Sequence, residues 1–442
     1  MWTAVRRWSS AVKHCTRQRT SLPCTSRVAS LDPLPHRRAH TTRQALFSSA
    51  ATEGKVQGPT FDAPLDSTRQ LATEALDTLK AQALEAEGPF TSWVSGEPYT
   101  AEEARAIAEV TAESLQSALG KTAAELQQMK IFFDLFGFLH VPNFVSQAQS
   151  SELVSAMHDL VEGWDPETEI TQFRTDSSQS NAQLSEAYFF ESRDKVHFFA
   201  EPHALDEDTG KLQVDKQVAL NKVGHGLHCV EGSVYQEYSQ SPAVVQLTHL
   251  LGWKAPVLPQ SMYIFKNPGI GGEVSSHQDS TFLFTEPRQT CLGMWLALHD
   301  ARLDNGCLWV RPSSHLEPVR RAARTTQAAD GSLQSLFEEL DEDSNATVTW
   351  EGSFPDAQDS SVVRGLFARG FIPVEVKAGD LVCFPGTLDH LSLANTSSLP
   401  RHTFQLHLVE GPDAGVRWAD SNWLQYPEGK SFPKMAANTT SQ

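Results

Sequence analysis

The sequence lacks several features that would place it in a class at once. It has no run of 18 consecutive apolar residues, so a membrane-spanning helix is not expected. Basic residues are outnumbered by acidic ones, 36 to 54, which argues against a nucleic-acid partner because phosphate contacts need a basic surface. Its six cysteines form no C-x-x-C pair, which argues against a disulfide framework. With 442 residues, 40% of them hydrophobic and ten of them Trp, the chain can still bury a substantial core.

Basic residues are concentrated at the N-terminus. Residues 1–50 contain nine Lys or Arg and thirteen Ser or Thr, but Asp32 is their single acid. A basic, serine-rich segment without an apolar stretch of 7–15 residues is typical of an organelle transit peptide rather than a secretory signal. We therefore predict a leader over residues 1–55 and import into mitochondria, with a plastid as the alternative. A disordered basic tail is the other interpretation of this composition.

Two further segments follow the leader. Residues 56–130 are rich in Ala, Glu and Leu, which favours a helical N-terminal extension. The main domain is predicted over residues 131–430 and begins with a short apolar element, a turn and a strand. A helix should come next, with Ser150 or Ser151 as its N-cap, because apolar residues recur at helical spacing. These residues are Leu153, Met157, Leu160 and Val161.

Short strand-like runs dominate after residue 185 and are separated by Gly, Pro, Asn and Asp, as in TCLGMWLALHD, LVCFPG and HTFQLHLVE. Such a pattern predicts a mainly β domain with flanking helices, either a sandwich or a barrel. In the last run, alternation places polar side chains on one face, which must look at water or into a functional cavity. That face contains Arg401, Thr403, Gln405 and His407. Residues 320–366 interrupt the strands, and we predict a loop insertion with a helix over about 333–340.

His277 and Asp279 form an H-x-D motif in one of these runs. Residues i and i+2 of a strand face the same way, so the two side chains can present a nitrogen and an oxygen to one metal ion. His390 is the best candidate for a third ligand, because it follows the run LVCFP and a turn. Two histidines and one carboxylate on one side of a metal suit non-haem Fe(II) with open positions. An isolated H-x-D is otherwise a common surface pattern.

Arg401 lies 11 residues after His390, at the start of the next strand. If the two strands pair as a hairpin, Arg401 points into the same cavity and offers a bidentate fork to a carboxylate. A dicarboxylate such as 2-oxoglutarate would chelate the metal through its keto-acid end and reach Arg401 with its far carboxylate. A zinc hydrolase uses similar ligands but does not need this arginine. A surface salt bridge is the simpler explanation of Arg401 taken alone.

Several segments together resemble the phytanoyl-CoA dioxygenase family. The matching segments are FFDLFGFLHVPNFVS (132–146), LNKVGHGLH (220–228), QSMYIF (260–265), GGEVSSHQDSTFLFTEP (271–287), LGMWLALHDA (292–301), NGCLWVRPSSH (305–315), VKAGDLVCFPGTLDHLSLANTSSLPRHTFQLHL (376–408) and SNWLQ (421–425). The resemblance implies a double-stranded β-helix, a cupin-like jelly-roll barrel with helices packed outside. It also implies Fe(II) held by His277, Asp279 and His390. By position in the family motifs, 2-oxoglutarate would contact Lys222, Met262, Trp295, Ser392 and Arg401.

The activity implied by this resemblance is hydroxylation of a small organic or acyl substrate, including an acyl-CoA, by Fe(II), 2-oxoglutarate and O₂, with release of succinate and CO₂. The carboxylate of Asp279 favours hydroxylation over halogenation, because relatives that halogenate have a small residue at its position. The phosphates of an acyl-CoA would need basic residues at the pocket mouth, for which Arg320, Arg321 and Arg324 are candidates. Two alternatives stay open: a 2-oxoglutarate-binding sensor with little turnover, and a cupin-like metal-dependent isomerase or hydrolase.

Overall fold

The computed structural model describes residues 63–86, 119–167, 170–172, 187–206, 208–340 and 357–435. The predicted leader and most of the predicted helical extension lie outside these residues, so both stay predictions. The described residues all fall in one structural unit, Ala63–Gln442. None of the helices in this part of the chain combines the length and the apolarity that crossing a bilayer requires.

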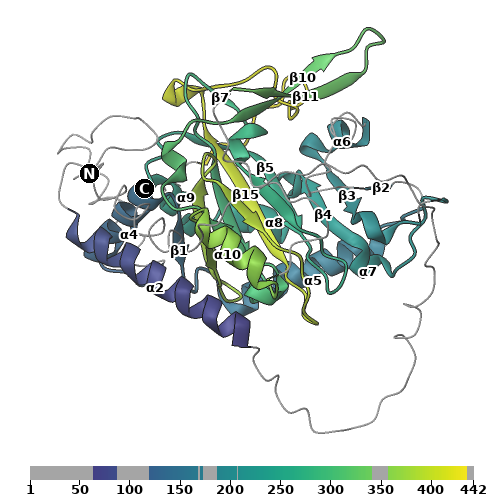
Figure 1. Ribbon diagram of the computed structural model, residues 1–442. Helices are drawn as coiled ribbons and strands as arrows, with labels where there is room; N and C mark the ends of the chain where they lie inside the picture. The colour runs from purple at the N-terminus through teal and green to yellow at the C-terminus, as the bar shows by residue number, and fades with distance from the viewer. Residues whose placement is uncertain are drawn as a thin grey trace, which may run out of the picture. The chain divides into compact units, whose positions relative to one another are not determined.

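Two antiparallel arrays of strands form the centre of this unit (Figure 1). The larger sheet contains, in spatial order, β1 (Leu139–Val141), β13 (Leu381–Pro385), β8 (Leu292–Ala297), β15 (Thr403–Glu410), β5 (Pro256–Ile264), β4 (Leu220–His225), β3 (Val196–Ala200) and β2 (Thr171–Gln172). The smaller sheet contains β12 (Ile372–Val374), β9 (Leu308–Val310), β14 (His390–Ser392) and β6 (Val274–His277). Among the strands that the structure describes, only the short edge strand β2 pairs in parallel, with β3.

The strand order is that of a double-stranded β-helix. From β5 onward the chain moves repeatedly between the sheets, which gives the orders β5-β15-β8-β13 in the larger and β6-β14-β9-β12 in the smaller. Each strand therefore pairs with neighbours that are distant in sequence, as in a jelly roll. This confirms the predicted fold class, except that the described strands form two facing sheets rather than one continuously hydrogen-bonded barrel.

Helices cover the sheets from outside. The helix α5 (Gln147–Gly163) packs Leu153, Met157 and Val161 against the larger sheet, in one apolar cluster with Phe404, Leu406 and Leu408 of β15. Beside the smaller sheet, helices α2 (Ala63–Glu85), α4 (Ala123–Phe136) and α10 (Ser360–Ala368) contribute to a second cluster. The remaining described helices are α6 (Ala187–Glu191), α7 (Lys216–Ala219), α8 (Val234–Ser239) and α9 (Pro242–Leu250).

The start of α5 differs from its prediction. Ser146, rather than Ser150 or Ser151, is the N-cap, and its hydroxyl accepts from the backbone N–H of Gln149 at 3.2 Å. The Gln149 side chain accepts in return from the backbone N–H of Ser146, which completes a capping box. Apolar periodicity indicates where a helix packs but not where its first turn begins, and Ser150 is buried inside the helix.

The insertion after residue 320 also differs from its prediction. It contains an antiparallel hairpin of β10 (Arg321–Gln327) and β11 (Leu333–Glu339), which stands at one end of the sheets in Figure 1. The expected helix over 333–340 is wrong. Leu336 and Leu340, which create the helical spacing, are exposed, whereas Ser335 and Phe337 share the buried face of a strand. Two short strands, β7 (Thr285–Glu286) and β16 (Arg417–Trp418), pair separately.

Candidate metal centre and co-substrate pocket

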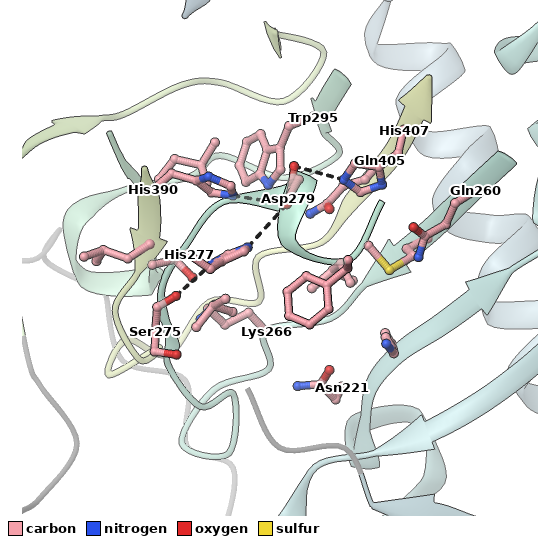
Figure 2. Close-up of a pocket in the computed structure, with 18 of the residues that line it drawn as sticks. Asn221, Gln260, Lys266, Ser275, His277, Asp279, Trp295, His390, Gln405 and His407 are labelled. Carbon is pink, nitrogen blue, oxygen red and sulfur yellow. Dashed lines mark hydrogen bonds and ion pairs between the residues drawn. The ribbon is translucent and has the colours of Figure 1, made fainter. Parts of the chain in front are cut away.

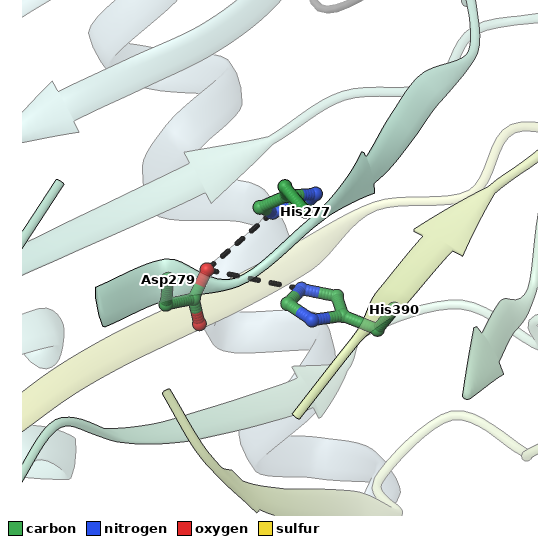
Figure 3. Close-up of side chains that lie close together, drawn as sticks. All are labelled: His277, Asp279 and His390. Carbon is green, nitrogen blue, oxygen red and sulfur yellow. Dashed lines mark ion pairs between the residues drawn. The ribbon is translucent and has the colours of Figure 1, made fainter. Parts of the chain in front are cut away.

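Three side chains of the predicted metal set come together at the edge of the smaller sheet (Figure 3). His277 ends β6, Asp279 begins the following short helix (Asp279–Thr281), and His390 begins β14. Strand pairing places His277 directly opposite His390. One ligand atom from each of the three residues lies within 4.8 Å of the other two.

Hydrogen bonds at the back of each imidazole direct its other nitrogen toward Asp279. Nδ1 of His277 donates to the carbonyl oxygen of Ser275 at 2.8 Å, and Nδ1 of His390 donates to that of Leu388 at 3.0 Å. Because a carbonyl oxygen only accepts, Nδ1 carries a proton in both rings, and Nε2 is the nitrogen left to bind a metal ion. The two Nε2 atoms lie 3.4 and 3.8 Å from Oδ1 of Asp279. Burial, together with the nearby His277, lowers the pKa of His390 to about 4, so this ring is neutral at physiological pH.

Asp279 is held from its other side by His407. Nε2 of His407, on β15, lies 3.2 Å from Oδ2 of Asp279. Burial opposes ionisation of this carboxyl, but its interactions with His407, His390 and His277 bring its pKa well below the usual range. Gly293 on β8 leaves the necessary space, because a Cβ there would lie 3.3 Å from Oδ2 and 2.8 Å from the Phe384 ring.

A pocket of about 180 Å³ opens beside the three residues and is lined from both sheets (Figure 2). Strand register explains its wall: Gln405 of β15 pairs with Met262 of β5 on one side and with Trp295 of β8 on the other. All three side chains line the pocket. The predicted polar face of β15 therefore faces a cavity, since Arg401 and His407 also line it.

Arg401 reaches the pocket by a route that differs from the predicted one. Strands β14 and β15 belong to different sheets, so they do not pair as a hairpin. Arg401 precedes β15 and is only 2% exposed, with its guanidinium carbon 5.3 Å from the centre of the Trp295 ring. Burial lowers its pKa to about 10, which still leaves it charged at neutral pH. Its Nε has no hydrogen-bond partner, and no carboxylate of the described residues forms an ion pair with it.

The other predicted 2-oxoglutarate contacts line the same pocket. Ser392 ends β14, two residues after His390. Lys222 lies on β4 with its ammonium 5.0 Å from the centre of the Phe199 ring, and burial lowers its pKa well below the usual value. Lys266, a second buried lysine of the pocket, was not predicted, and its Nζ donates to the carbonyl oxygens of Gly272 and Leu393. Its place directly after the β5 segment was the one available signal.

A buried ion-pair network lies behind the metal set and was also missed. Asp389, which precedes His390, accepts from both terminal nitrogens of Arg320 at 2.9 and 3.1 Å and from Arg311 at 3.2 Å. Ser276, which precedes His277, donates to Asp389 at 2.5 Å. Arg320 is therefore committed to a buried carboxylate and does not lie free at the pocket mouth, as an acyl-CoA phosphate contact would require.

The converging donors suit an iron ion. Two imidazole nitrogens and one carboxylate oxygen, grouped on one side of a pocket, are the donor set of non-haem Fe(II) oxygenases. The backbone carbonyls behind both rings fix their orientation, as outer partners of metal-binding histidines commonly do. The partnerless Nε of the buried Arg401 in the same pocket fits the far carboxylate of a dicarboxylic co-substrate.

Sequence comparison identifies relatives over most of the chain. The sequence profile of the phytanoyl-CoA dioxygenase (PhyH) family matches residues 133–403. The chain is 36% identical to "Phytanoyl-CoA dioxygenase" of Arabidopsis thaliana over 307 residues, which cover 70% of this chain and 96% of the relative. It is 37% identical to "Phytanoyl-CoA dioxygenase domain-containing protein 1" of Danio rerio over 302 residues, which cover 68% and 94% of the two chains.

Solved structures with a similar fold are more distant. The epimerase SnoN, in complex with Fe3+, alpha ketoglutarate and nogalamycin RO, gives a TM-score of 0.46 at 13% identity and covers 71% of this chain and 99% of that one. EctD from S. alaskensis gives 0.40 at 17% identity, with 67% and 79% covered. Scores this low do not bear on the reaction, so the assignment rests on sequence. The chain belongs to the phytanoyl-CoA dioxygenase family and is, as the sequence predicted, an Fe(II)- and 2-oxoglutarate-dependent dioxygenase.

Proposed function

We propose that this dioxygenase hydroxylates an acyl chain or another small organic molecule at a C–H bond held beside His277, Asp279 and His390. The observation that carries the proposal is that these three residues and the buried guanidinium of Arg401 line one pocket. Bound Fe(II) and 2-oxoglutarate supply the activation of O₂ and the oxidation of the substrate, with release of succinate and CO₂.

Different residues of the pocket bind the metal and the co-substrate. The Nε2 atoms of His277 and His390 and the carboxylate of Asp279 hold the metal on one side and leave its other positions for ligands. Arg401 and Ser392 take the far carboxylate of 2-oxoglutarate. Because Arg401 is buried, its attraction for that carboxylate is screened less than it would be in water.

Three further side chains orient the co-substrate. Trp295 and Met262 provide an apolar wall along its carbon chain, and the register of β8, β15 and β5 keeps them level with each other. Lys222 brings a buried amine to the same pocket, and a bound carboxylate would favour its charged form. All three roles are proposed from family motif positions, and their placement in one pocket supports them.

An acyl substrate agrees with the remaining lining. Beyond the metal set, the pocket is bordered by Phe189, Phe282, Leu283 and Trp423, which suit an apolar body. The relatives' names specify phytanoyl-CoA, so a CoA thioester is one candidate form of the substrate and a free acid is another.

Anaerobic reconstitution tests this proposal. Protein lacking residues 1–55 would be mixed with Fe(II) and 2-oxoglutarate, and the visible metal-to-ligand charge-transfer band would be recorded before O₂ is admitted and succinate followed. We expect both the band and succinate. A band without succinate across a panel of acyl-CoAs and free acids would favour a sensor. Iron binding without any band would favour a cupin-like isomerase or hydrolase.

We also propose that the protein acts in mitochondria. The basic, acid-poor composition of residues 1–50 supports this location. A fluorescent protein fused after residue 55 should enter mitochondria with the leader and remain outside without it. Delivery to another compartment by the same 55 residues would contradict the assignment.

A further inference from the structure

The arginines around the start of the hairpin have unequal surroundings. Arg311 forms ion pairs with Glu317 and Asp389, and Arg320 forms a bidentate pair with Asp389. Arg324, on the outer side of β10, pairs with Glu338 at 2.8 Å and lies over the Phe284 ring. Each of these three side chains is therefore already engaged with a carboxylate of the protein.

Arg321 is the exception in this segment. It begins β10 and lines the pocket that contains His277, Asp279 and His390. Its guanidinium carbon lies 4.2 Å from the centre of the Phe337 ring, on the adjacent strand. Its register partner Glu339 is exposed and attracts the guanidinium only at a distance, because no described carboxylate lies within ion-pair distance of Arg321. The stacked ring thus fixes the direction of the guanidinium without neutralising its charge.

Aromatic side chains surround Arg321 and border the same pocket. Phe337 contacts Phe282 edge to face, with ring centres 5.9 Å apart. Phe189 and Trp423, which line the same pocket, lie with their ring centres 4.3 Å apart. A ligand in this pocket would be bordered by aromatic side chains, by the metal set and by the cation of Arg321.

We infer that the substrate is a free carboxylic acid with an apolar body, and that Arg321 binds its carboxylate; this rests on the hydroxylase function proposed above. A planar guanidinium matches a carboxylate bidentately, whereas an ester or thioester carbonyl has no charge to offer it. The position of Arg321 also favours an acid over an acyl-CoA. Arg321 borders the metal-containing pocket itself, while the phosphates of a CoA lie at the far end of a long pantetheine arm. Arg321 is accordingly a specificity-determining residue.

Calorimetry on the intact Fe(II)–2-oxoglutarate protein without O₂ tests the inference. The probes are octanoate, methyl octanoate and octanoyl-CoA, and saturating 2-oxoglutarate occupies Arg401. We expect octanoate to bind roughly 10- to 100-fold more tightly than methyl octanoate, which is the range of one charge-assisted pair. R321Q should lose this preference, and R321K, which keeps the charge but not the fork, should retain part of it. R324Q is the matched control from the same strand and should keep the full preference.

Three results would overturn the inference: equal binding of octanoate and its methyl ester by the wild type, an unchanged acid preference in R321Q, or tighter binding of octanoyl-CoA than of octanoate. Thermal unfolding of each variant would verify that it is folded, and R321K serves if R321Q is not. Binding heats do not depend on turnover. A missing charge-transfer band in the wild type would therefore count against the proposed function and leave the acid preference measurable on its own.

Discussion

Two buried aspartates lie on opposite sides of the strands β6 and β14 and have contrasting partners. Asp279 faces the pocket, is 8% exposed, and is surrounded by the imidazoles of His277, His390 and His407 at 3.2–3.8 Å. Asp389 is fully buried on the other side and is paired with two arginines. The imidazoles and the carboxylate of Asp279 can bind one metal ion together. The carboxylate of Asp389 cannot, because its arginine partners are always charged and neutralise it.

The same contrast holds for two buried arginines. Arg320 forms a bidentate pair with Asp389, so its charge is already satisfied within the protein. Arg401 is similarly buried, yet it forms no ion pair with a described carboxylate and lies over the face of Trp295. Asp389 and Arg320 therefore form a structural support behind the strands, whereas Asp279 and Arg401 belong to the ligand-receptive surface in front of them. Substitutions in front of the strands should therefore weaken metal or co-substrate binding, whereas substitutions behind them should lower stability.

The largest effect is expected for Asp279→Ala. Removing the carboxylate leaves two imidazoles, which hold Fe(II) too weakly for turnover, so bound iron and succinate production should both fall to background. The fold should survive, because no fixed cation loses its partner. Iron analysis after desalting and a succinate assay measure the outcome. Normal turnover in this variant would contradict the metal assignment.

Asp389→Ala should act on stability instead. It leaves the buried guanidinium of Arg320 without its carboxylate, and breaking a buried pair in this way costs about 3–5 kcal/mol in the free energy of unfolding. Denaturant unfolding measures the loss. Asp413→Ala is the matched control, because Asp413 is exposed and its pair with Lys434 should contribute at most about 1 kcal/mol. Equal effects of the two substitutions would remove the distinction between the two sides.

Arg401→Ala should weaken 2-oxoglutarate specifically. The lost charge-assisted contact is worth about 1.5–3 kcal/mol, or roughly a 10- to 100-fold rise in the dissociation constant. Fe(II) affinity without 2-oxoglutarate should be unchanged, because Arg401 contacts none of the three proposed metal ligands. Titration of the charge-transfer band with 2-oxoglutarate gives the constant. A variant that lost iron but bound 2-oxoglutarate normally would reverse the assigned roles.

The smallest effect concerns acid stability. Burial opposes ionisation of Asp389, but Arg320 and Arg311 hold the pKa of its carboxyl below the usual value. The pair therefore stabilises the fold above the unfolded pKa of about 3.9, and this contribution is lost as pH falls through the lower folded pKa. Unfolding of wild type and Asp389→Asn from pH 6 to pH 2.5 should show a shallower acid slope in the variant. Parallel slopes would mean that Asp389 does not titrate differently on folding.

Local pattern was sufficient for the ligand-receptive side. The two-residue period of a strand placed His277 and Asp279 together, and alternation through Arg401, Gln405 and His407 predicted a polar face, which lines the pocket. Each of these predictions depends only on which way neighbouring side chains point.

The sequence pattern gave a wrong prediction where both a helical and a strand periodicity fit the same segment. Leu333, Leu336 and Leu340 have helical spacing, but Leu333, Ser335 and Phe337 also alternate as a strand. The strand wins because β10 supplies a partner and Phe337 gains contacts with Arg321 and Phe282. Tertiary contacts of this kind override local propensity.

The support behind the strands could not be predicted at all. Arg320 and Asp389 lie 69 residues apart and have no fixed spacing in sequence, and Arg320 looked like a member of a basic surface cluster. Only the path of the chain through both sheets brings them together. Whether an arginine stabilises the fold or binds a ligand can therefore be decided only from the folded structure. The neighbours Arg320 and Arg321, which differ in this respect, show the same.

The most direct test of the account is a crystal structure of the Fe(II)–2-oxoglutarate complex, with anomalous scattering recorded at the iron edge. We predict one iron peak bonded to Nε2 of His277, Nε2 of His390 and a carboxylate oxygen of Asp279, with the far carboxylate of 2-oxoglutarate against Arg401. An iron peak elsewhere, or a co-substrate that leaves Arg401 without a ligand, would contradict it.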